Sequence, residues 1–336
     1  MIAPIDKEIL KKELTSEKLV RPTNKGHNEV YFITAHDSPN VMREIGRLRE
    51  LSYRDSGGGT GEEVDTDYFD YMEKPYKQLI VWNPADEEIL GGFRFIHGKD
   101  MNFNEDGQPD IVTSHLFHYS DTFIKDYLPY SIDLGRAFVQ PAYQSSKMGT
   151  KSLFAMDNLW DGLGAIAAEP NTKYFLGKIS IYPHFDKISR EMILYFIHKH
   201  YPDPDNLLTP KEPIPCCSDE EEMEIYFGGS DLKENLKKLQ VLVRERGYNI
   251  PPLLHIYLNL SPTMRSFGSC INYEFSNLYE TGLMITISEI FEEKKIRYIE
   301  SYLNYRQQLF EPFYDKKYGK IKNFRRWLRK YRKIFG

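Results

Sequence analysis

SIDLGRAFV at residues 131–139 and KYFLGKISI at residues 173–181 are two apolar runs that have the length of β-strands. Between them, residues 149–168 repeat apolar side chains at helical spacing, and Pro170 ends this predicted helix. A strand, a helix and a second strand in this order predict a parallel crossover in an α/β sheet. In open α/β sheets the ligand lies in the crevice beyond the strand ends at such a crossover, so we expect the functional site here.

The segments on either side extend this crossover into a mixed α/β fold. We expect further strands at residues 30–34, 78–82, 89–96, 253–258 and 282–287. We expect helices at residues 38–53, with Ser38 as the N-cap, and at 187–201, 232–246 and 290–309. This order predicts a mixed central sheet flanked by helices. We divide the chain into an N-terminal arm (1–26), a main domain (27–292) with an insertion at about 202–230, and a helical basic tail (293–336).

Composition excludes several classes of protein. The 336 residues are 41% apolar with a formal net charge of −5, which is typical of a folded chain rather than a disordered one. The longest apolar stretches, at residues 163–168 and 251–260, are shorter than the ~18 residues of a membrane span. The N-terminus holds no secretory signal, and Cys216, Cys217 and Cys270 lack the spacing of a metal site or disulfide framework. We therefore expect a cytoplasmic protein without a metal site.

The C-terminal residues 315–336 carry ten basic residues and one acidic residue, a net charge of +9, which leaves −14 for the other 314 residues. Apolar side chains recur in this segment at spacings of three and four, which predicts a basic amphipathic helix. Three uses remain open: an anchor on anionic lipid, a patch for nucleic acid or an acidic protein, or a helix packed on the body. Nucleic acid is disfavoured because the rest of the chain is acidic. The expected contact residues are Lys322, Arg325, Arg326, Trp327, Arg329 and Lys330.

Three charged clusters are candidates for chemistry. The first follows the glycine-rich loop 57–61 and consists of Glu62, Glu63, Asp65, Asp67 and Asp70. The alternative interpretation is that these carboxylates form a solvent-exposed face without a chemical role. The second is Arg94, which follows two glycines within a predicted strand. The alternative interpretation is an arginine on an edge strand without a functional role. The third is Asp133 with Arg136. Residues three apart point to opposite faces of an ideal strand, whereas a bulge at Gly135 would bring both side chains into one cleft.

An ordered set of motifs carries a family resemblance over roughly residues 30–290. The motifs are residues 48–54 (LRELSYR), 63–70 (EVDTDYFD), 92–95 (GFRF), 133–139 (DLGRAFV) with Tyr143, 159–163 (LWDGL), 175–180 (FLGKIS) and 251–258 (PPLLHIYL). With them the chain resembles the GNAT-related acyltransferases that use acyl carrier protein thioesters. Within that group it resembles the N-acyl-amino-acid lipid synthases of glycine- and ornithine-lipid formation, and more distantly the N-acyl-homoserine lactone synthases. Some similar sequences carry a haemolysin label, which we do not interpret as pore formation.

The resemblance implies a GNAT-like sheet that separates between residues 131–139 and 173–181 to admit a pantetheine arm. It also implies a 3-hydroxyacyl or acyl donor on the phosphopantetheine of acyl carrier protein, no bound cofactor, and a small amino acid as acceptor. Glycine is preferred because residues 174–202 look closer to the glycine-lipid branch. Coenzyme A is a less favoured donor, because residues 144–149 (QSSKMG) stand where GNAT enzymes carry their pyrophosphate loop.

The same resemblance suggests roles for individual residues. Asp133 is expected to act as the base or to orient the amine, with Glu63 as a possible substitute. Arg94 and Arg136 are expected to clamp the acceptor carboxylate or the pantetheine phosphate, since a planar guanidinium binds either group with two hydrogen bonds. The other residues expected to bind substrate or donor are Arg54, Asp67, Asp70, Phe138, Val139, Tyr143 and Lys178.

Two alternatives to this enzyme remain open. One is a signal synthase that makes an acyl-homoserine lactone, whose product would need no membrane tail. The other is a non-catalytic adaptor that lies on a membrane surface through its basic tail. The main hypothesis also places the protein at the inner face of the membrane, where a long acyl product would remain.

Overall fold

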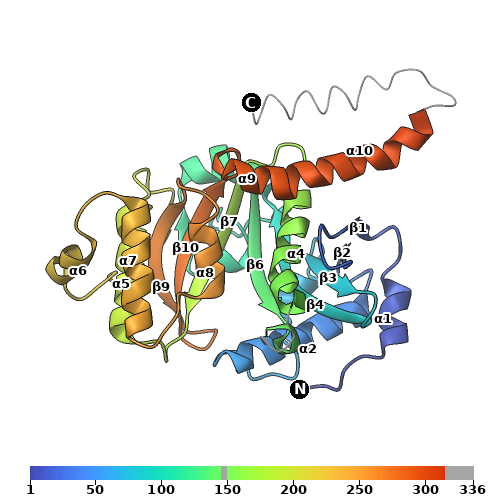
Figure 1. Cartoon of the computed structure of the whole chain (residues 1–336), viewed down its shortest axis with the longest axis horizontal. Helices are drawn as coiled ribbons and strands as arrows, with labels where there is room; N and C mark the ends of the chain where they lie inside the picture. Colours follow the sequence, from blue (N-terminus) through green and yellow to red (C-terminus); the bar gives the residue numbers. More distant parts are fainter. Residues whose placement is uncertain (145–149, 315–336) are drawn as a thin grey trace.

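The computed structural model describes residues 1–144 and 150–314, which form one large mixed sheet with helices on both faces (Figure 1). The sheet strands are β1 (Leu19–Pro22), β2 (Glu29–Ile33), β3 (Lys77–Asn83), β4 (Glu88–His97), β6 (Ser131–Val139), β7 (Tyr174–Ile181), β9 (Arg265–Asn272) and β10 (Leu278–Thr286). Their order is β1-β2-β3-β4-β6-β7-β10-β9, and β5 (Phe117–Tyr119) and β8 (Leu208–Pro210) form a separate pair. All neighbours in the large sheet are antiparallel except β6 and β7, which are parallel.

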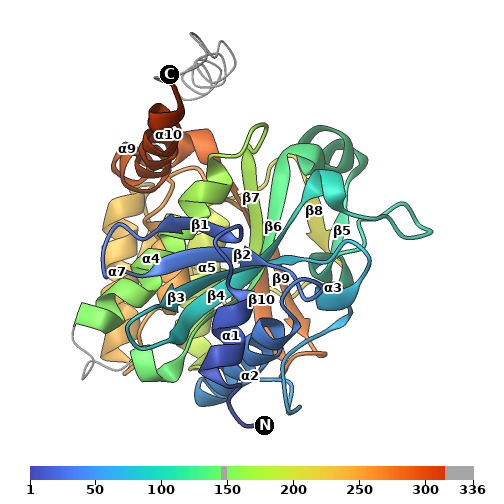
Figure 2. The same cartoon turned by 90° about the vertical axis from the view of Figure 1, so that its right-hand side faces the viewer.

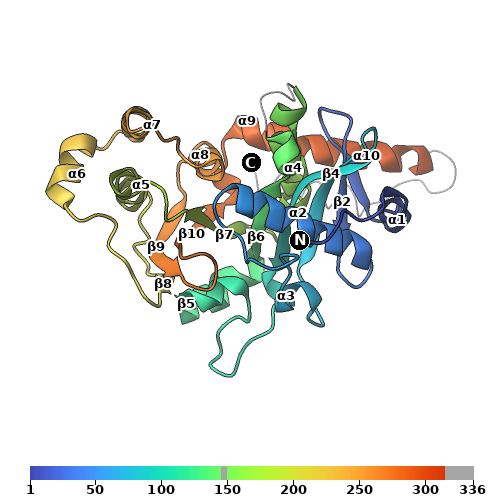
Figure 3. The same cartoon turned by 90° about the horizontal axis from the view of Figure 1, so that it is seen from below.

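Helices cover the two faces of this sheet. They are α1 (Lys7–Glu13), α2 (Pro39–Asp55), α3 (Tyr68–Tyr71), α4 (Thr150–Ala167), α5 (Lys187–His200), α6 (Glu220–Phe227), α7 (Leu232–Glu245), α8 (Pro252–Leu258), α9 (Glu292–Lys294) and α10 (Ser301–Tyr314). Helices α4, α5, α7 and α8 lie on one side of the sheet, and α3 and the β5–β8 pair lie on the other (Figure 3). Helices α1 and α2 lie in front of β3 and β4 in Figure 2. This arrangement confirms the predicted mixed α/β class.

The alternation of side chains along β3 separates two parts of the core. Leu79 and Val81 pack with α4 on one face of the sheet. Ile80 and Trp82 point to the opposite face and pack with α1 and α2. Successive residues of a strand point to opposite faces, so a strand covered on both faces reads as a continuous apolar run.

The predicted crossover is confirmed: β6, α4 and β7 follow one another, and β6 and β7 are parallel neighbours. Their pairing runs only from Ser131 with Tyr174 to Asp133 with Leu176. Beyond Asp133, β6 stays paired with β4, and β7 stays paired with β10. The two central strands therefore separate at Asp133, as the family resemblance implied.

A β-bulge interrupts β6 directly after this point. Gly92 and Arg94 of β4 pair with Phe138 and Gly135 of β6, so three steps along β6 match two along β4. Arg136 is the extra residue and has a φ of 53°. We expected the bulge at Gly135, and the structure places the left-handed residue one position later. A positive φ is uncommon in residues other than glycine and is often found at functional sites.

Residues 253–258, predicted as a strand, instead lie within helix α8, so that prediction is wrong. Pro252 stands at the first turn of α8, where its fixed φ suits a helix and its missing N–H leaves no bond unmade. A short run that is apolar throughout does not distinguish a buried helix from a buried strand. The edge strand β9 was also missed, although its partner β10 covers residues 282–286 of the predicted strand 282–287.

The start of α2 lies where it was predicted, but Ser38 does not cap it. The side chain of Ser38 makes no capping hydrogen bond to the helix. Instead, the carboxylate of Glu13 accepts hydrogen bonds from the backbone N–H groups of Asn40 (3.2 Å) and Val41 (2.9 Å). A carboxylate at a helix N-terminus satisfies otherwise free N–H groups and favours the helix dipole. Glu13, the last residue of α1, thus fixes the N-terminal arm to the body.

The C-terminal part of the described chain runs along one end of the sheet through α9, a π-helical turn (Lys295–Glu300) and α10 (Figure 1). No helix within residues 1–144 and 150–314 is both long and apolar enough to cross a membrane. The basic amphipathic helix predicted for residues 315–336, with its six expected contact residues, lies outside the described residues.

Candidate active site

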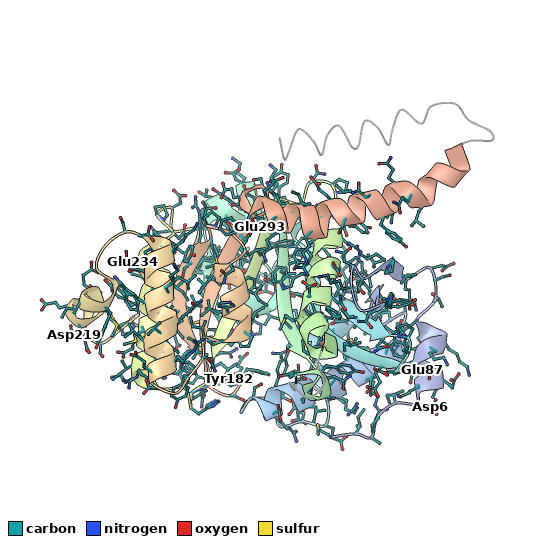
Figure 4. All side chains as sticks on the ribbon, viewed as in Figure 1. Asp6, Glu87, Tyr182, Asp219, Glu234 and Glu293 are labelled. Carbon is teal, nitrogen blue, oxygen red and sulfur yellow. The ribbon has the colours of Figure 1, made fainter. Side chains whose placement is uncertain are left out.

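A cavity of about 550 Å³ lies between β6 and β7, where the two strands separate. Its apolar wall comes mainly from α4 and α8 and includes Met156, Leu159, Trp160, Leu163, Leu254 and Tyr257. Its polar wall includes Arg94, Thr113, Asp133, Arg136, Lys178 and Glu280. Tyr182, another lining residue, lies at the lower edge of the molecule in Figure 4, between the part that carries α7 and the part that carries α2. The cavity therefore joins a long apolar surface to a small group of charged side chains.

Asp133 lies at the point where the strands separate and is only 2% exposed. Its carboxylate accepts a hydrogen bond from the Tyr76 hydroxyl (2.7 Å) and another from the Thr113 hydroxyl (2.9 Å). Burial raises the pKa of Asp133 above its usual value, although both hydrogen bonds and the charge of Lys178 oppose the shift. A carboxylate that is held in place and has a raised pKa is a better proton acceptor near neutral pH.

Arg94 is enclosed by two carboxylates and is only 1% exposed. Its guanidinium donates two hydrogen bonds to Asp67, at 2.7 and 2.8 Å, and lies 3.1 Å from Asp70. Burial raises the pKa of Asp67, but hydrogen bonding to Arg94 outweighs this effect and lowers it to about 2. Asp70 also pairs with buried Arg49 at 3.3 Å. The edge position considered for Arg94 is therefore wrong, because its partners come from α3 and the turn before it.

Arg136 projects from the bulge and has a more accessible side chain than Arg94, with 19% of it exposed. Its guanidinium lies 3.1 Å from Asp65 and 3.5 Å from Asp67. The guanidinium carbon also lies 4.5 Å from the centre of the Phe275 ring. The bulge thus brings Asp133 and Arg136 to one cavity, as the sequence predicted.

A second buried carboxylate, Glu280 of β10, also lines the cavity. It lies 2.7 Å from the Lys178 ammonium group, and the side chains of both residues are largely buried. Asn272 donates a hydrogen bond to Glu280 at 3.2 Å. This ion pair adds a second buried carboxylate to the polar wall that carries Asp133.

The remaining predicted site residues fall into two groups. Phe138, Val139 and Tyr143 line the cavity. Arg54 and Glu63 are not among its lining residues: Glu63 is exposed on its loop, and Arg54 pairs with Glu50 through a hydrogen bond of 2.6 Å. Glu63 therefore lies outside the cavity, and we do not propose it as a substitute base.

Sequence reasoning missed three polar residues of this site: Tyr76, Thr113 and Glu280. Each is a single residue from a segment distant in sequence from Asp133, and no motif surrounds it. The pairing of β10 with β7 brings Glu280 to the cavity, and the packing of residues 98–130 on the sheet brings Thr113 there. Tyr76 stands just before β3 and reaches the site through its hydrogen bond to Asp133. No pattern within their own segments would have identified them.

Comparison with known proteins places this site in a family. The acetyltransferase (GNAT) domain model matches residues 48–153. A glycine N(alpha)-acyltransferase of Phocaeicola vulgatus is 54% identical over 304 residues, which are 90% of this chain and 93% of the relative. A glycine N(alpha)-acyltransferase of Bacteroides thetaiotaomicron is 53% identical over 90% of each chain.

Two solved structures show a distant likeness. The CoA-dependent acyl-homoserine lactone synthase BjaI with MTA has a TM-score of 0.37 and 8% identity, over 82% of this chain and 89% of that one. FeeM, an N-acyl amino acid synthase from uncultured soil microbes, has a TM-score of 0.27 and 14% identity, over 49% of this chain and 77% of that one.

Sequence identity and the domain match together define the class of protein, an acyltransferase of the GNAT type. The chain belongs to the family of N-acyltransferases that contains the two glycine N(alpha)-acyltransferases. The family resemblance expected from the motifs is therefore confirmed. A non-catalytic adaptor is no longer a candidate function.

Proposed function

We propose that this protein transfers a fatty acyl or 3-hydroxyacyl group from the thioester of acyl carrier protein to the amine of glycine, as a step in the synthesis of amino-acid-containing membrane lipids. The observation that carries the proposal is Asp133, a buried carboxylate where the two central strands separate, next to a cavity with a long apolar wall. The two relatives named glycine N(alpha)-acyltransferase support glycine as the acceptor.

Asp133 supplies the proton acceptor for this reaction. The amine of glycine attacks the thioester carbonyl carbon only after it has lost a proton, and Asp133 takes that proton directly or through a water molecule. A carbon–nitrogen bond forms, the carbon–sulfur bond breaks, and the second proton of the attacking nitrogen passes to the departing pantetheine thiolate, while the first proton leaves Asp133 for solvent. Tyr76 and Thr113 hold the Asp133 carboxylate in place throughout.

The oxyanion that forms during attack needs hydrogen-bond donors. The backbone N–H of Gln140 is already used, because it donates to the carbonyl oxygen of Leu90 at 2.9 Å. The edge of β6 that faces β7 has no strand partner beyond Asp133, whereas its other edge stays paired with β4. We therefore assign the oxyanion to backbone N–H groups on the β7-facing edge of β6 beyond Asp133.

Arg136 is the better of the two expected arginines for binding the glycine carboxylate. Both arginines line the cavity, but the Arg94 side chain is 1% exposed and enclosed by Asp67 and Asp70, whereas 19% of the Arg136 side chain is exposed and it shares Asp67 with Arg94. A guanidinium binds a carboxylate through two parallel hydrogen bonds. Arg94 then acts as a positioning residue, because it holds the carboxylate of Asp67 against Arg136.

We expect Arg136→Asn to raise the KM for glycine by about 10- to 100-fold, since a hydrogen bond to a charged group contributes about 1.5–3 kcal/mol. Asparagine tolerates the left-handed backbone at this position, so the bulge is retained. Steady-state kinetics with glycine varied at a fixed donor concentration measure the change. Arg246→Ala, which removes an ion pair with Asp186 that does not line the cavity, is the control. Equal KM values for the two variants would exclude Arg136 as the carboxylate ligand.

The proposal also places the protein at the inner face of the membrane through its basic C-terminal segment. The support is the sequence of residues 315–336 alone. Each cation near an anionic lipid surface contributes about 1 kcal/mol. We expect replacement of Arg325, Arg326 and Arg329 by alanine to weaken flotation of the full chain with anionic vesicles by about 100-fold. Unchanged flotation of this variant would exclude the segment as the anchor, and vesicles of neutral lipid are the control.

A further inference from the structure

Two apolar side chains of the main cavity also border a second, smaller space. Trp160 and Leu163 line both the main cavity and this second space of about 20 Å³, which is partly open to the surface and is called the void below. The other residues around this void are Gly164, Ala167, Phe175, Leu260, Ile290, Lys294, Tyr298 and Ile299. Nearly all of them are apolar, so Trp160 and Leu163 separate two apolar surfaces.

The larger of the two shared side chains is the indole of Trp160. Its ring centre lies 6.4 Å from that of Tyr257, which lines only the main cavity, and 6.2 Å from that of Tyr298, which lines only the void. Trp160 is 9% exposed. Because the indole borders both spaces and contacts a tyrosine of each, its removal is expected to join them.

The far side of the void is firmly held. The Tyr298 hydroxyl donates a hydrogen bond to Asp157 of α4 at 2.7 Å. At Gly164 a Cβ atom would lie 2.3 Å from the backbone oxygen of Tyr298, so α4 and the π-helical turn are already in close contact. The space gained by removal of the Trp160 indole would therefore not be filled by a simple inward shift of this turn.

We propose that Trp160 is the end wall of the acyl-binding cavity and sets the longest acyl chain that the enzyme accepts. This inference rests on the proposed function, since the apolar wall of the cavity must hold the acyl chain of the donor. It adds a role for a residue of the 159–163 motif to which the resemblance assigned none. The chain enters past Asp133 with its thioester carbonyl, and its terminal methyl group meets the indole.

The test is the acyl-chain profile of Trp160→Ala with a series of acyl carrier protein donors that differ by two carbons. We expect the longest efficiently used chain to become longer, with a gain of roughly fourfold in kcat/KM for each added methylene that enters the opened space. The native enzyme should show a sharp fall at its own limit. Trp160→Phe is expected to shift the limit by less, and it keeps the inference testable if the alanine variant does not fold.

Leu159→Ala is the matched control. Leu159 lies on the same helix, is buried to a similar degree and lines the main cavity but not the void. We expect it to weaken the use of all chains without moving the limit. An unchanged limit in folded Trp160→Ala, or an equal shift in Leu159→Ala, would overturn the inference while leaving the proposed function intact. If the native enzyme forms no N-acyl product with any donor in the series, the proposed function fails and this inference fails with it.

Discussion

Asp133→Asn is expected to lower kcat by about two to four orders of magnitude, which is the usual contribution of a positioned general base. Asparagine keeps the size of the side chain; its one carbonyl oxygen can accept from one of the two hydroxyls of Tyr76 and Thr113 and its NH2 group can donate to the other, but it cannot take a proton from the amine. The KM values for donor and acceptor should change little. Single-turnover kinetics, with circular dichroism to confirm folding, measure the effect.

The dependence of kcat on pH tests the role of Asp133 independently. Because burial raises the pKa of Asp133 above its usual 3.8, its carboxylate becomes protonated at a higher pH than that of an exposed aspartate. The kcat of the native enzyme should therefore fall as the pH drops through this raised pKa. The pH profile of Asp133→Asn should lack this acidic limb. Glu280→Gln, which alters the other buried carboxylate of the cavity, is the control. A large loss in Glu280→Gln together with full activity in Asp133→Asn would reverse the assignment of the base.

The largest expected loss of stability follows from Arg94→Met. This change leaves Asp67 and Asp70 partly or fully buried without their main counter-charge, and removal of one partner of a buried ion pair costs about 3–5 kcal/mol. Arg94→Lys should recover only part of the loss, because an ammonium group cannot make both parallel hydrogen bonds to Asp67. Urea unfolding followed by circular dichroism measures the free energy of unfolding.

Arg246→Ala is a suitable comparison for this experiment as well. It removes an ion pair with Asp186 at the surface, and exposed pairs contribute at most about 1 kcal/mol. If Arg94→Met is no less stable than Arg246→Ala, the buried cluster around Arg94 does not stabilise the fold as its geometry indicates.

The central part of the fold was predictable because its signals are local. Residues 131–181 contain two runs of strand length on either side of a helix with clear periodicity, and the structure has these elements within one or two residues of the predicted ends. Residues 251–260 carry no such signal, since nearly all their side chains are apolar and only Pro252 indicates a helix start. The fold could thus be predicted where hydrophobic periodicity exists, and not where it is absent.

The site was predictable to the extent that its residues share a segment. Asp133 and Arg136 lie three positions apart, so a single bulge was enough to bring them into one cavity. Arg94 was found by its neighbouring glycines, but its burial depends on Asp67 and Asp70 from a different element. Tertiary packing, which no local pattern records, determines such contacts.

The central claim is tested most directly by mass spectrometry of the product that purified protein forms from glycine and an acyl carrier protein thioester. A parallel reaction supplies the same acyl group on coenzyme A, and Asp133→Asn serves as the inactive control. We predict N-acylglycine with the native protein, formed faster from the carrier protein than from coenzyme A. Absence of N-acylglycine with both donors, or faster transfer from coenzyme A, would contradict the proposed acceptor or the proposed donor respectively.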